Sequence, residues 1–389
     1  MNRLITALVT ILIWVSAVIA VPEGIPIQYM DARGRMPMST FERTQLSGDR
    51  GSYCRTVTAQ TIGSDAETVV LLVEEGINSA ISSALSTFQT DLVSDGYDVE
   101  VWLISGGSAE DIREDLKTEY SGGELVGAIC IGDIPTGWMD NGYGEYPLDL
   151  FLIDMNGILS VMDFISIYES RSNAAPEIWV GRLTPTYLTF GGSASLLNDY
   201  FAKNHAYRTG ALSLPDRALA YNEAFPQFNL TQYLEDLYTA VVRKYDYIET
   251  NADDFKAELQ SGYEWVHLIS HSSPWGSSFH TGAPPEGAGT LYNFEVPPLD
   301  PHAFFYVLNC CSNGRWTEID NLANSYIWCN SYGLAVLAQA KVDYTNYFEE
   351  YYQSLAAGNC LGAAFRTWLA ANMSMEDGAV LLGDPTLRP

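Results

Sequence analysis

Basic side chains are scarce in this sequence of 389 residues. It holds 20 lysines and arginines against 48 aspartates and glutamates, so its formal net charge at pH 7 is −28. A surface of that sign repels the phosphates of nucleic acids and anionic membranes. The composition therefore argues against nucleic acid as a partner. It is compatible with basic peptides or divalent cations, and with an acidic surface that only keeps the protein soluble.

Cysteines and long apolar runs are few as well. The six cysteines have no Cys-x-x-Cys spacing, which argues against a structural zinc site, and they are too few for a disulfide scaffold in so long a chain. After residue 20 there is no run of about 18 apolar residues, so we expect no stable membrane insertion of the mature chain.

The chain divides into four predicted parts. Residues 1–20 carry a basic residue, an apolar run and small residues, which indicates a secretory signal peptide, with an uncleaved anchor as the alternative. We therefore expect a secreted protein, whether extracellular, periplasmic or at the cell surface. Residues 21–65 lack periodicity and suggest a leader or short pro-segment, although an edge strand near 53–58 is the alternative. Residues 66–213 and 214–389 are predicted to be two α/β subdomains, because the remaining chain exceeds what one core normally organises.

Apolar strands alternate with helix-length segments from residue 66 onward, which predicts crossover connections and mostly parallel sheets. Ser108 and Asp111 form a capping-box pattern at the start of one helix. Strands are expected over 68–73, 99–104, 125–131, 217–222, 245–247, 263–269, 304–309 and 333–338. Helices are expected over 78–92, from 108 onward, and over 191–207, 229–242, 252–259, 321–329, 347–355 and 361–373.

Two stretches of the second half carry reactive side chains. Residues 263–276 contain an apolar run that leads to His271, and residues 304–316 contain one that leads to Cys310 and Cys311. Each run then breaks into Ser, Pro, Asn and Gly, as a buried parallel strand does where it enters a loop. Ligands bind at the carboxyl ends of such strands, so we expect the imidazole and the thiol to lie at one edge. A thiol needs a neighbouring imidazole to raise its thiolate fraction, and the pattern predicts a Cys/His hydrolase.

A structural role is the alternative for each of these residues. A cysteine at a strand end is often a small buried hydrophobe, and a loop histidine often only forms hydrogen bonds. Adjacent Cys310 and Cys311 would point to opposite faces of a strand, so only one of them is expected to face a site. His267 lies inside its apolar run and is expected to fill the core.

The sequence Cys-Ser-Asn-Gly-Arg-Trp over residues 311–316 resembles the nucleophile segment of gingipain-like cysteine peptidases, an apolar strand followed by Cys-x-Asn-Gly-x-aromatic. This resemblance selects Cys311 over Cys310. His271, with Trp275 and Gly276 shortly after it, is similar to the family's histidine segment. Further landmarks in family order extend the resemblance over about residues 67–389, at 132–135, 147–157, 177–183 and 382–387.

The resemblance implies a caspase-haemoglobinase type of fold, with two side-by-side α/β subdomains, mostly parallel sheets flanked by helices, and the active site on the second. It implies a reaction through a thioester acyl-enzyme in which Cys311 attacks and His271 protonates the leaving amine. It further implies that Glu223 orients the imidazole, with an ordinary surface glutamate as the alternative. Backbone amides of Ser272 and Cys311 are expected to hold the oxyanion.

The predicted chemistry requires no cofactor and no catalytic metal, and the partners are expected to be protein or peptide substrates. A structural Ca²⁺ ion is compatible with the resemblance, although no stretch has EF-hand spacing. Trp275 and Tyr344 are candidates for the walls of a substrate pocket, with burial in the core as the alternative. The sequence sets no oligomeric state.

The chain also departs from the family pattern. Ser270 and Ser272 stand where the family usually has glycine. If the backbone after His271 needs a positive φ, Ser272 carries strain of about 1 kcal/mol. The loop 225–229 has no secure match for the acidic residue that selects arginine or lysine in some members.

The sequence therefore predicts a secreted cysteine endopeptidase. Two alternatives stay open: a catalytically silent gingipain-like binding or scaffold protein, and a carboxylate-based glycan hydrolase, for which no localised carboxylate pair is found.

Overall fold

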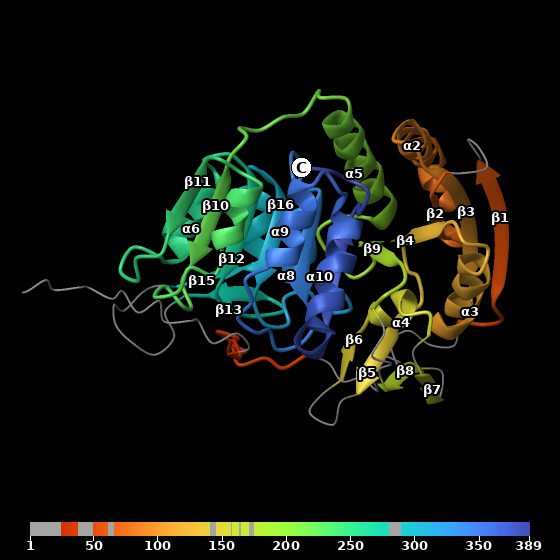
Figure 1. Ribbon diagram of the computed structural model, residues 1–389, viewed down its shortest axis with the longest axis horizontal. Coiled ribbons are helices and arrows are strands. Elements are labelled where there is room, and N and C mark those ends of the chain that lie inside the picture. Colours follow the sequence, from red (N-terminus) through yellow and green to blue (C-terminus); the bar gives the residue numbers. More distant parts are fainter. Residues whose placement is uncertain are drawn as a thin grey trace, which may run out of the picture.

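The apolar strands expected from the sequence form one large sheet in the computed structural model (Figure 1). The structure describes residues 25–37, 50–60, 66–140, 145–156, 158–162, 165–170, 175–279 and 289–389. The expected signal peptide, residues 1–20, and parts of the expected leader lie outside the described residues.

The described residues form an 11-stranded sheet. In spatial order its strands are β1 (Cys54–Gln60), β3 (Asp98–Ser105), β2 (Thr68–Glu74), β4 (Leu125–Ile131), β9 (Trp179–Leu183), β18 (Ala379–Gly383), β17 (Ala335–Gln339), β16 (Ala303–Asn309), β12 (Tyr263–Ile269), β10 (Ala218–Asn222) and β11 (Val241–Lys244). Neighbouring strands are parallel except where β1 meets β3 and β18 meets β17. The predicted α/β class with mostly parallel strands is therefore confirmed.

Strand β18 joins the two halves of the sheet. It pairs parallel with β9 and antiparallel with β17, so the parallel strands β2, β3, β4 and β9 run opposite to the parallel strands β10, β11, β12, β16 and β17. The two predicted sheets thus form one continuous sheet in the structure. The predicted boundary between residues 213 and 214 stays a prediction.

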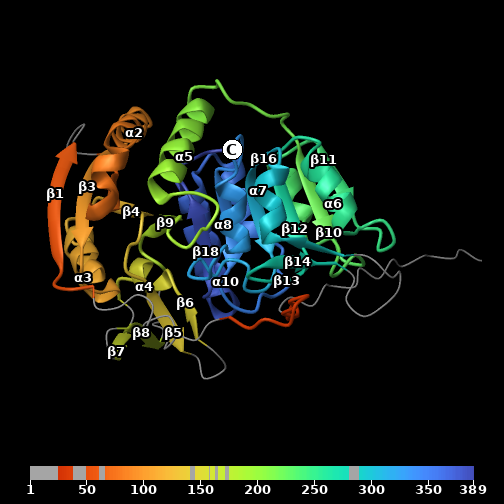
Figure 2. The same cartoon turned by 180° about the vertical axis from the view of Figure 1, so that it is seen from behind.

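Helices lie against both faces of the sheet (Figures 1 and 2). They are α2 (Glu75–Ser94), α3 (Ala109–Tyr120), α4 (Leu150–Ile153), α5 (Ser193–Arg208), α6 (Ala252–Leu259), α7 (Val296–Leu299), α8 (Leu322–Ile327), α9 (Glu349–Ala356) and α10 (Leu361–Glu376), with short 3-10 turns η1 (Gln232–Asp236) and η2 (Asn293–Glu295). The capping box of α3 is confirmed, because Ser108 accepts the Asp111 amide and Asp111 accepts the Ser108 amide. No helix of the described residues has the length and apolar character needed to cross a membrane.

Two small sheets flank the large one. They are formed by β13 (His271–Ser273), β14 (Gly276–Ser278) and β15 (Thr290–Tyr292), and by β6 (Glu145–Pro147), β5 (Gly137–Asp140), β8 (Ile165–Ser170) and β7 (Ile158–Met162). The helix predicted over 229–242 is wrong: η1 is followed by edge strand β11. Adjacent Val241 and Val242 are β-branched and suit a strand beside β10 better than a helix.

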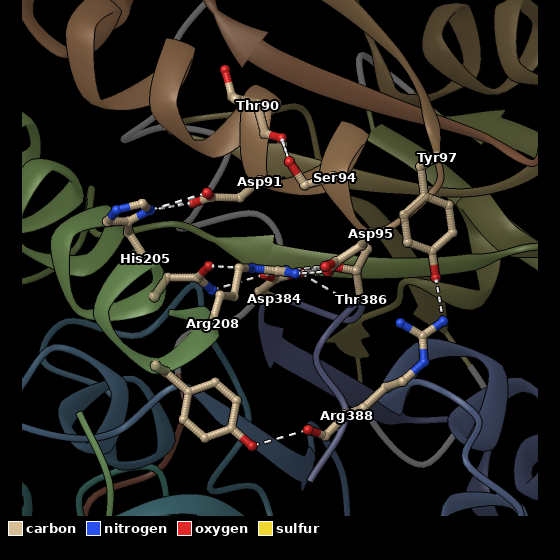
Figure 3. A network of polar contacts seen from close by, with 12 residues as sticks. Thr90, Asp91, Ser94, Asp95, Tyr97, His205, Arg208, Asp384, Thr386 and Arg388 are labelled. Carbon is tan, nitrogen blue, oxygen red and sulfur yellow. Dashed lines mark hydrogen bonds and ion pairs between the residues drawn. The ribbon is translucent and has the colours of Figure 1, made fainter. Parts of the chain in front are cut away.

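A network of charges ties the connecting helix α5 to the C-terminal segment (Figure 3). Arg208 donates through Nη2 to Asp384 Oδ2 at 2.5 Å and to Thr386 Oγ1 at 2.6 Å, and it also pairs with Asp95 at the end of α2. Asp384 is fully buried and accepts a second hydrogen bond from Asn204 Nδ2 at 2.8 Å. The landmark at 382–387 therefore binds α5 to the strand that joins the two halves.

We expect Asp384→Asn to lower the free energy of unfolding by about 3 kcal/mol, because it leaves a buried arginine without its buried counter-ion. The matched control is Asp95→Asn, which removes a carboxylate from the same guanidinium. The Asp95 side chain is 32% exposed, so its loss should cost about 1 kcal/mol or less. Urea unfolding followed by tryptophan fluorescence measures both, and equal losses would contradict the assignment.

Candidate active site

Strands β12 and β16 are parallel neighbours in the large sheet. Their last paired residues are Ile269 and Asn309, so both strands end at the same edge. His271 lies two residues after Ile269, and Cys311 lies two residues after Asn309. The structure therefore brings the imidazole and the thiol to one edge of the sheet, where the sequence places them.

The loop after β16 is enclosed: residues 311–318 are all buried. The Ser312 amide donates to Lys341 O at 2.7 Å, and the Gly314 amide donates to Gln339 O at 2.8 Å. The Asn313 side chain accepts the Gln339 amide at 3.3 Å. A Cβ atom on Gly314 would lie within 2.9 Å of the side chains of Ala338 and Val380, so only glycine fits against β17 and β18. These contacts explain the Asn-Gly pair of the motif as a clamp on the loop that carries the thiol.

A buried stack supports the same loop from the first half of the chain. Arg182 on β9 binds Asp149 Oδ1 through Nε at 2.6 Å, and both side chains are buried. The guanidinium carbon of Arg182 lies 4.6 Å from the centroid of the Trp316 ring. Three sequence landmarks that are far apart in the chain thus meet beneath the loop.

The two adjacent cysteines have different surroundings. The Cys310 thiol lies 3.3 Å from Ser270 Oγ and belongs to the main hydrophobic core. Cys311 belongs to a separate small cluster with Ile27, Leu230 and Ile269. Only Cys311 therefore faces the edge that carries His271.

Residues 25–30 cross this edge, red beside β13 in Figure 1. Before the crossing they pair antiparallel with residues 343–345: the Ile27 amide donates to Asp343 O at 2.8 Å and the Thr345 amide donates to Ile25 O at 2.9 Å. After it, the Met30 amide donates to Ser272 O at 2.8 Å. The segment is thus bound by main-chain hydrogen bonds on both sides of the two reactive groups.

The peptide bond between Ile27 and Gln28 lies across the reactive pair. The Cys311 thiol donates to Ile27 O at 2.9 Å. The Gln28 amide donates to His271 Nδ1 at 3.2 Å. The thiol therefore contacts the acyl side of a peptide bond and the imidazole contacts its amine side.

Burial beneath this segment shifts the pKa values of Cys311 and His271 in opposite directions. It raises the pKa of the Cys311 thiol and lowers the pKa of the His271 imidazole, since each shift disfavours the charged form. The covered site therefore holds a neutral thiol and a neutral imidazole, whose Nδ1 acts as an acceptor toward Gln28.

Residues 54–389 match the model of peptidase family C25, the gingipain family. The chain belongs to this family. It is therefore a cysteine peptidase, and the resemblance seen in the sequence is confirmed. None of the curated proteins compared with the chain matches it. The segment that covers Cys311 and His271 lies outside the matched residues.

The strained backbone is at Ser312, next to Cys311. The sequence had suggested strain at Ser272, next to His271. Ser312 has a positive φ of 54°. Ser272 is not among the described residues with a positive φ. Ser272 lies in strand β13, and its Oγ donates to Cys311 O at 2.6 Å. The substitution of glycine by Ser272 thus adds a hydrogen bond between the two reactive stretches without a strained backbone.

Glu223 occupies the expected place at the exit of β10. It is buried, and its amide donates to Ile269 O at 2.9 Å. Burial raises the pKa of Cys310 and of Tyr221, with smaller contributions from the charges of Asp343 and Asp254, respectively, and then of Glu223. Its action on His271 stays a prediction, as do the oxyanion roles of the Ser272 and Cys311 amides.

Both candidate wall residues contact the N-terminal segment. Tyr344 forms an antiparallel bridge with Pro26. Trp275 donates through Nε1 to Ile319 O at 3.1 Å, and the Arg35 guanidinium lies 4.3 Å from the centroid of its ring. Tyr344 thus contacts the chain before the crossing, and Trp275 contacts a residue that follows the crossing.

Sequence reasoning missed the strip formed by Asp343, Tyr344 and Thr345 as a binding element. Asn309 holds this strip in place through hydrogen bonds from Nδ2 to Asp343 Oδ2 at 2.7 Å and to Tyr344 O at 3.0 Å. The alternation of Ile25, Pro26 and Ile27 in the leader was the available signal for its partner.

The structural Ca²⁺ ion that the resemblance allows stays a prediction. In the part of the chain that the structure describes, no three His, Cys, Asp or Glu side chains gather in a way that could hold a metal ion. No step of the chemistry is assigned to a metal.

We expect Ser312→Gly to leave the free energy of unfolding unchanged or to raise it by up to about 1 kcal/mol, because glycine adopts a positive φ without strain. Ser312→Val should lower it by about 2 kcal/mol, since a β-branched residue is disfavoured there. The same valine change at exposed Ser331 serves as the control and should stay within about 0.5 kcal/mol. Chemical denaturation measures all three; equal losses at both serines would refute the strain.

In the intact chain, alkylation of Cys311 by iodoacetamide should be slow at neutral pH and accelerate only above the ordinary cysteine pKa of about 8.5. The reason is that burial raises the pKa of this thiol. Ile27→Asp places a carboxylate in an apolar cluster and should release the segment. The pH at which the alkylation rate of Cys311 rises should then be lower. Met36→Asp is the charge-matched control, because Met36 is 74% exposed. Peptide mapping by mass spectrometry measures the rate, and identical profiles for all three chains would contradict the prediction.

Proposed function

We propose that the chain is a secreted endopeptidase that hydrolyses peptide bonds through a thioester, with Cys311 as nucleophile and His271 as general acid and base. The observation that carries the proposal is the peptide bond of residues 27 and 28, held with its carbonyl oxygen on Cys311 and its amide on His271. Secretion is supported by the signal-peptide pattern of residues 1–20.

The reaction follows from the two contacts. Cys311 sulfur attacks the carbonyl carbon, the thiol proton passes to His271, and His271 gives it to the leaving nitrogen as the carbon–nitrogen bond breaks. The acyl group remains on sulfur as a thioester. Water then attacks the thioester carbon and loses a proton to His271, which returns the proton to the thiolate as the carboxylic acid product leaves.

Neighbouring groups assist this reaction in the proposal. The amides of Ser272 and Cys311 stabilise the oxyanion, a contribution of about 3 kcal/mol for one good donor in comparable sites. Glu223 orients the imidazole from the end of the neighbouring strand. Thiol and imidazole chemistry of this kind requires no cofactor.

An endopeptidase is favoured over an exopeptidase because the bound segment passes through the site. Residues 25–27 pair with the strip 343–345, and the chain continues past the reactive groups to the contact of Met30 with Ser272. A site that binds chain on both sides accommodates a bond in the interior of a substrate. The cleaved partners are therefore proteins or internal peptide segments.

The rival function is a catalytically silent binding protein of the same family. A peptidyl chloromethyl ketone distinguishes the two when it is applied to the full-length Ile27→Asp chain, in which the thiol is uncovered. We expect an adduct on Cys311 and hydrolysis of unfolded casein, with both reduced at least about 100-fold by His271→Ala.

Cys310→Ala is the matched control for Cys311→Ala, because the two thiols are adjacent and Cys310 lies in the core. Only the change at Cys311 should abolish hydrolysis. Equal labelling of several cysteines without hydrolysis would favour the silent protein. Hydrolysis of glycans that survives Cys311→Ala would favour the carboxylate-based enzyme.

A further inference from the structure

The side chain of Ile27 fills a small apolar pocket beside the thiol. Ile27 is 1% exposed, and its cluster contains Leu230, Ile269 and Cys311 as fully buried members. Partly buried side chains surround the cluster: Tyr29, Ala224, Phe225, Phe228 and Tyr347. The pocket is therefore lined by aliphatic and aromatic groups.

The backbone on either side of Ile27 is bound without regard to side-chain identity. The bonds between residues 25–27 and 343–345 use main-chain amides and carbonyls, apart from one from the Ile25 amide to Thr345 Oγ1 at 2.9 Å. Pro26 is exposed and Ile25 is half-buried. Selection among substrates on this side therefore depends chiefly on the pocket of Ile27.

The loop that forms one wall of the pocket is held in place. Asn222 is fully buried, and its Nδ2 donates to Phe225 O at 2.8 Å and to Phe228 O at 2.9 Å. Its Oδ1 accepts the Phe225 amide at 3.0 Å. One side chain thus fixes both phenylalanines, so the apolar wall is preformed.

Asp343, which pairs with the main chain of Ile27, has its carboxylate bound by other groups. Asp343 accepts from Asn309 Nδ2 at 2.7 Å and from the Tyr344 amide at 2.9 Å. A lysine or arginine in the Ile27 pocket would lose its hydration among apolar side chains, which is costly for a charged group.

We propose that Ile27 marks the pocket for the residue before the cleaved bond, so that this peptidase cuts after branched aliphatic residues. The inference rests on the proposed function, because it takes the bond between residues 27 and 28 as the position of the scissile bond. The substrate class is an extended peptide with isoleucine, valine or leucine at that position.

A peptide that copies residues 25–30, isoleucine-proline-isoleucine-glutamine-tyrosine-methionine, tests the proposal. The enzyme is the full-length Ile27→Asp chain, and mass spectrometry locates the cut. We expect cleavage between the third and fourth residues. Valine at the third position should stay within about tenfold of the parent, alanine should lower kcat/KM at least about tenfold, and arginine, lysine or aspartate at least about 100-fold.

A pocket variant provides a second readout. Phe228→Asp should lower kcat/KM for the isoleucine peptide at least about tenfold and raise it for the arginine peptide at least about tenfold, because it places a carboxylate in the pocket wall. Gln227→Asp is the charge-matched control, since Gln227 is exposed on the same loop. It should leave both values within about twofold.

The outcomes separate this inference from the proposed function. Preferred cleavage after arginine or lysine, or a cut elsewhere in the parent peptide, would overturn the aliphatic preference and leave the peptidase intact. Absence of cleavage of every peptide and of casein, together with unselective labelling of Cys311, would overturn the proposed function and the inference with it. Should Phe228→Asp fail to fold, the peptide series decides alone.

Discussion

The site depends on the register between strands β12 and β16. Because Ile269 pairs with Asn309, the positions two residues further on place His271 and Cys311 at the same edge. A slip of one residue would exchange the faces of the side chains and present Cys310 in place of Cys311. The hydrogen bond from Ser272 Oγ to Cys311 O continues the alignment beyond the last pair. The register of β12 and β16 therefore determines which side chains meet at the candidate site.

That constraint explains why most of the nucleophile motif is structural. Asn313 and Gly314 hold the loop against β17, while Trp316 rests on Arg182 from the other half of the chain. The positive φ of Ser312 is the local strain that these contacts maintain. In the proposed mechanism, a thiol on a loop that is anchored at so many points loses little conformational freedom when a substrate binds, which favours reaction of correctly placed peptides.

The sequence predicted the features that depend on local pattern and missed those that depend on distant partners. Apolar runs of strand length identified β12 and β16, and the reactive residues at their ends followed from the change of composition. Strand β18 was missed because its neighbours β9 and β17 lie far away in the sequence. The segment around Ile27 was missed for the same reason, since its partner Asp343 belongs to the other end of the chain. The prediction of a helix over 229–242 was wrong because the β-branched residues Val241 and Val242 belong to edge strand β11.

Occupancy of the pocket and protonation of the reactive pair are coupled. Ile27 packs against Cys311, and burial favours the neutral form of both Cys311 and His271. In the mechanism proposed here, a substrate that fills the same pocket imposes the same condition. In the proposed mechanism, the attack then starts from a thiol that gives up its proton during attack, rather than from a thiolate formed beforehand. Nδ1 of His271 accepts the hydrogen bond of the Gln28 amide, and we therefore propose it as the atom that gives a proton to the leaving nitrogen.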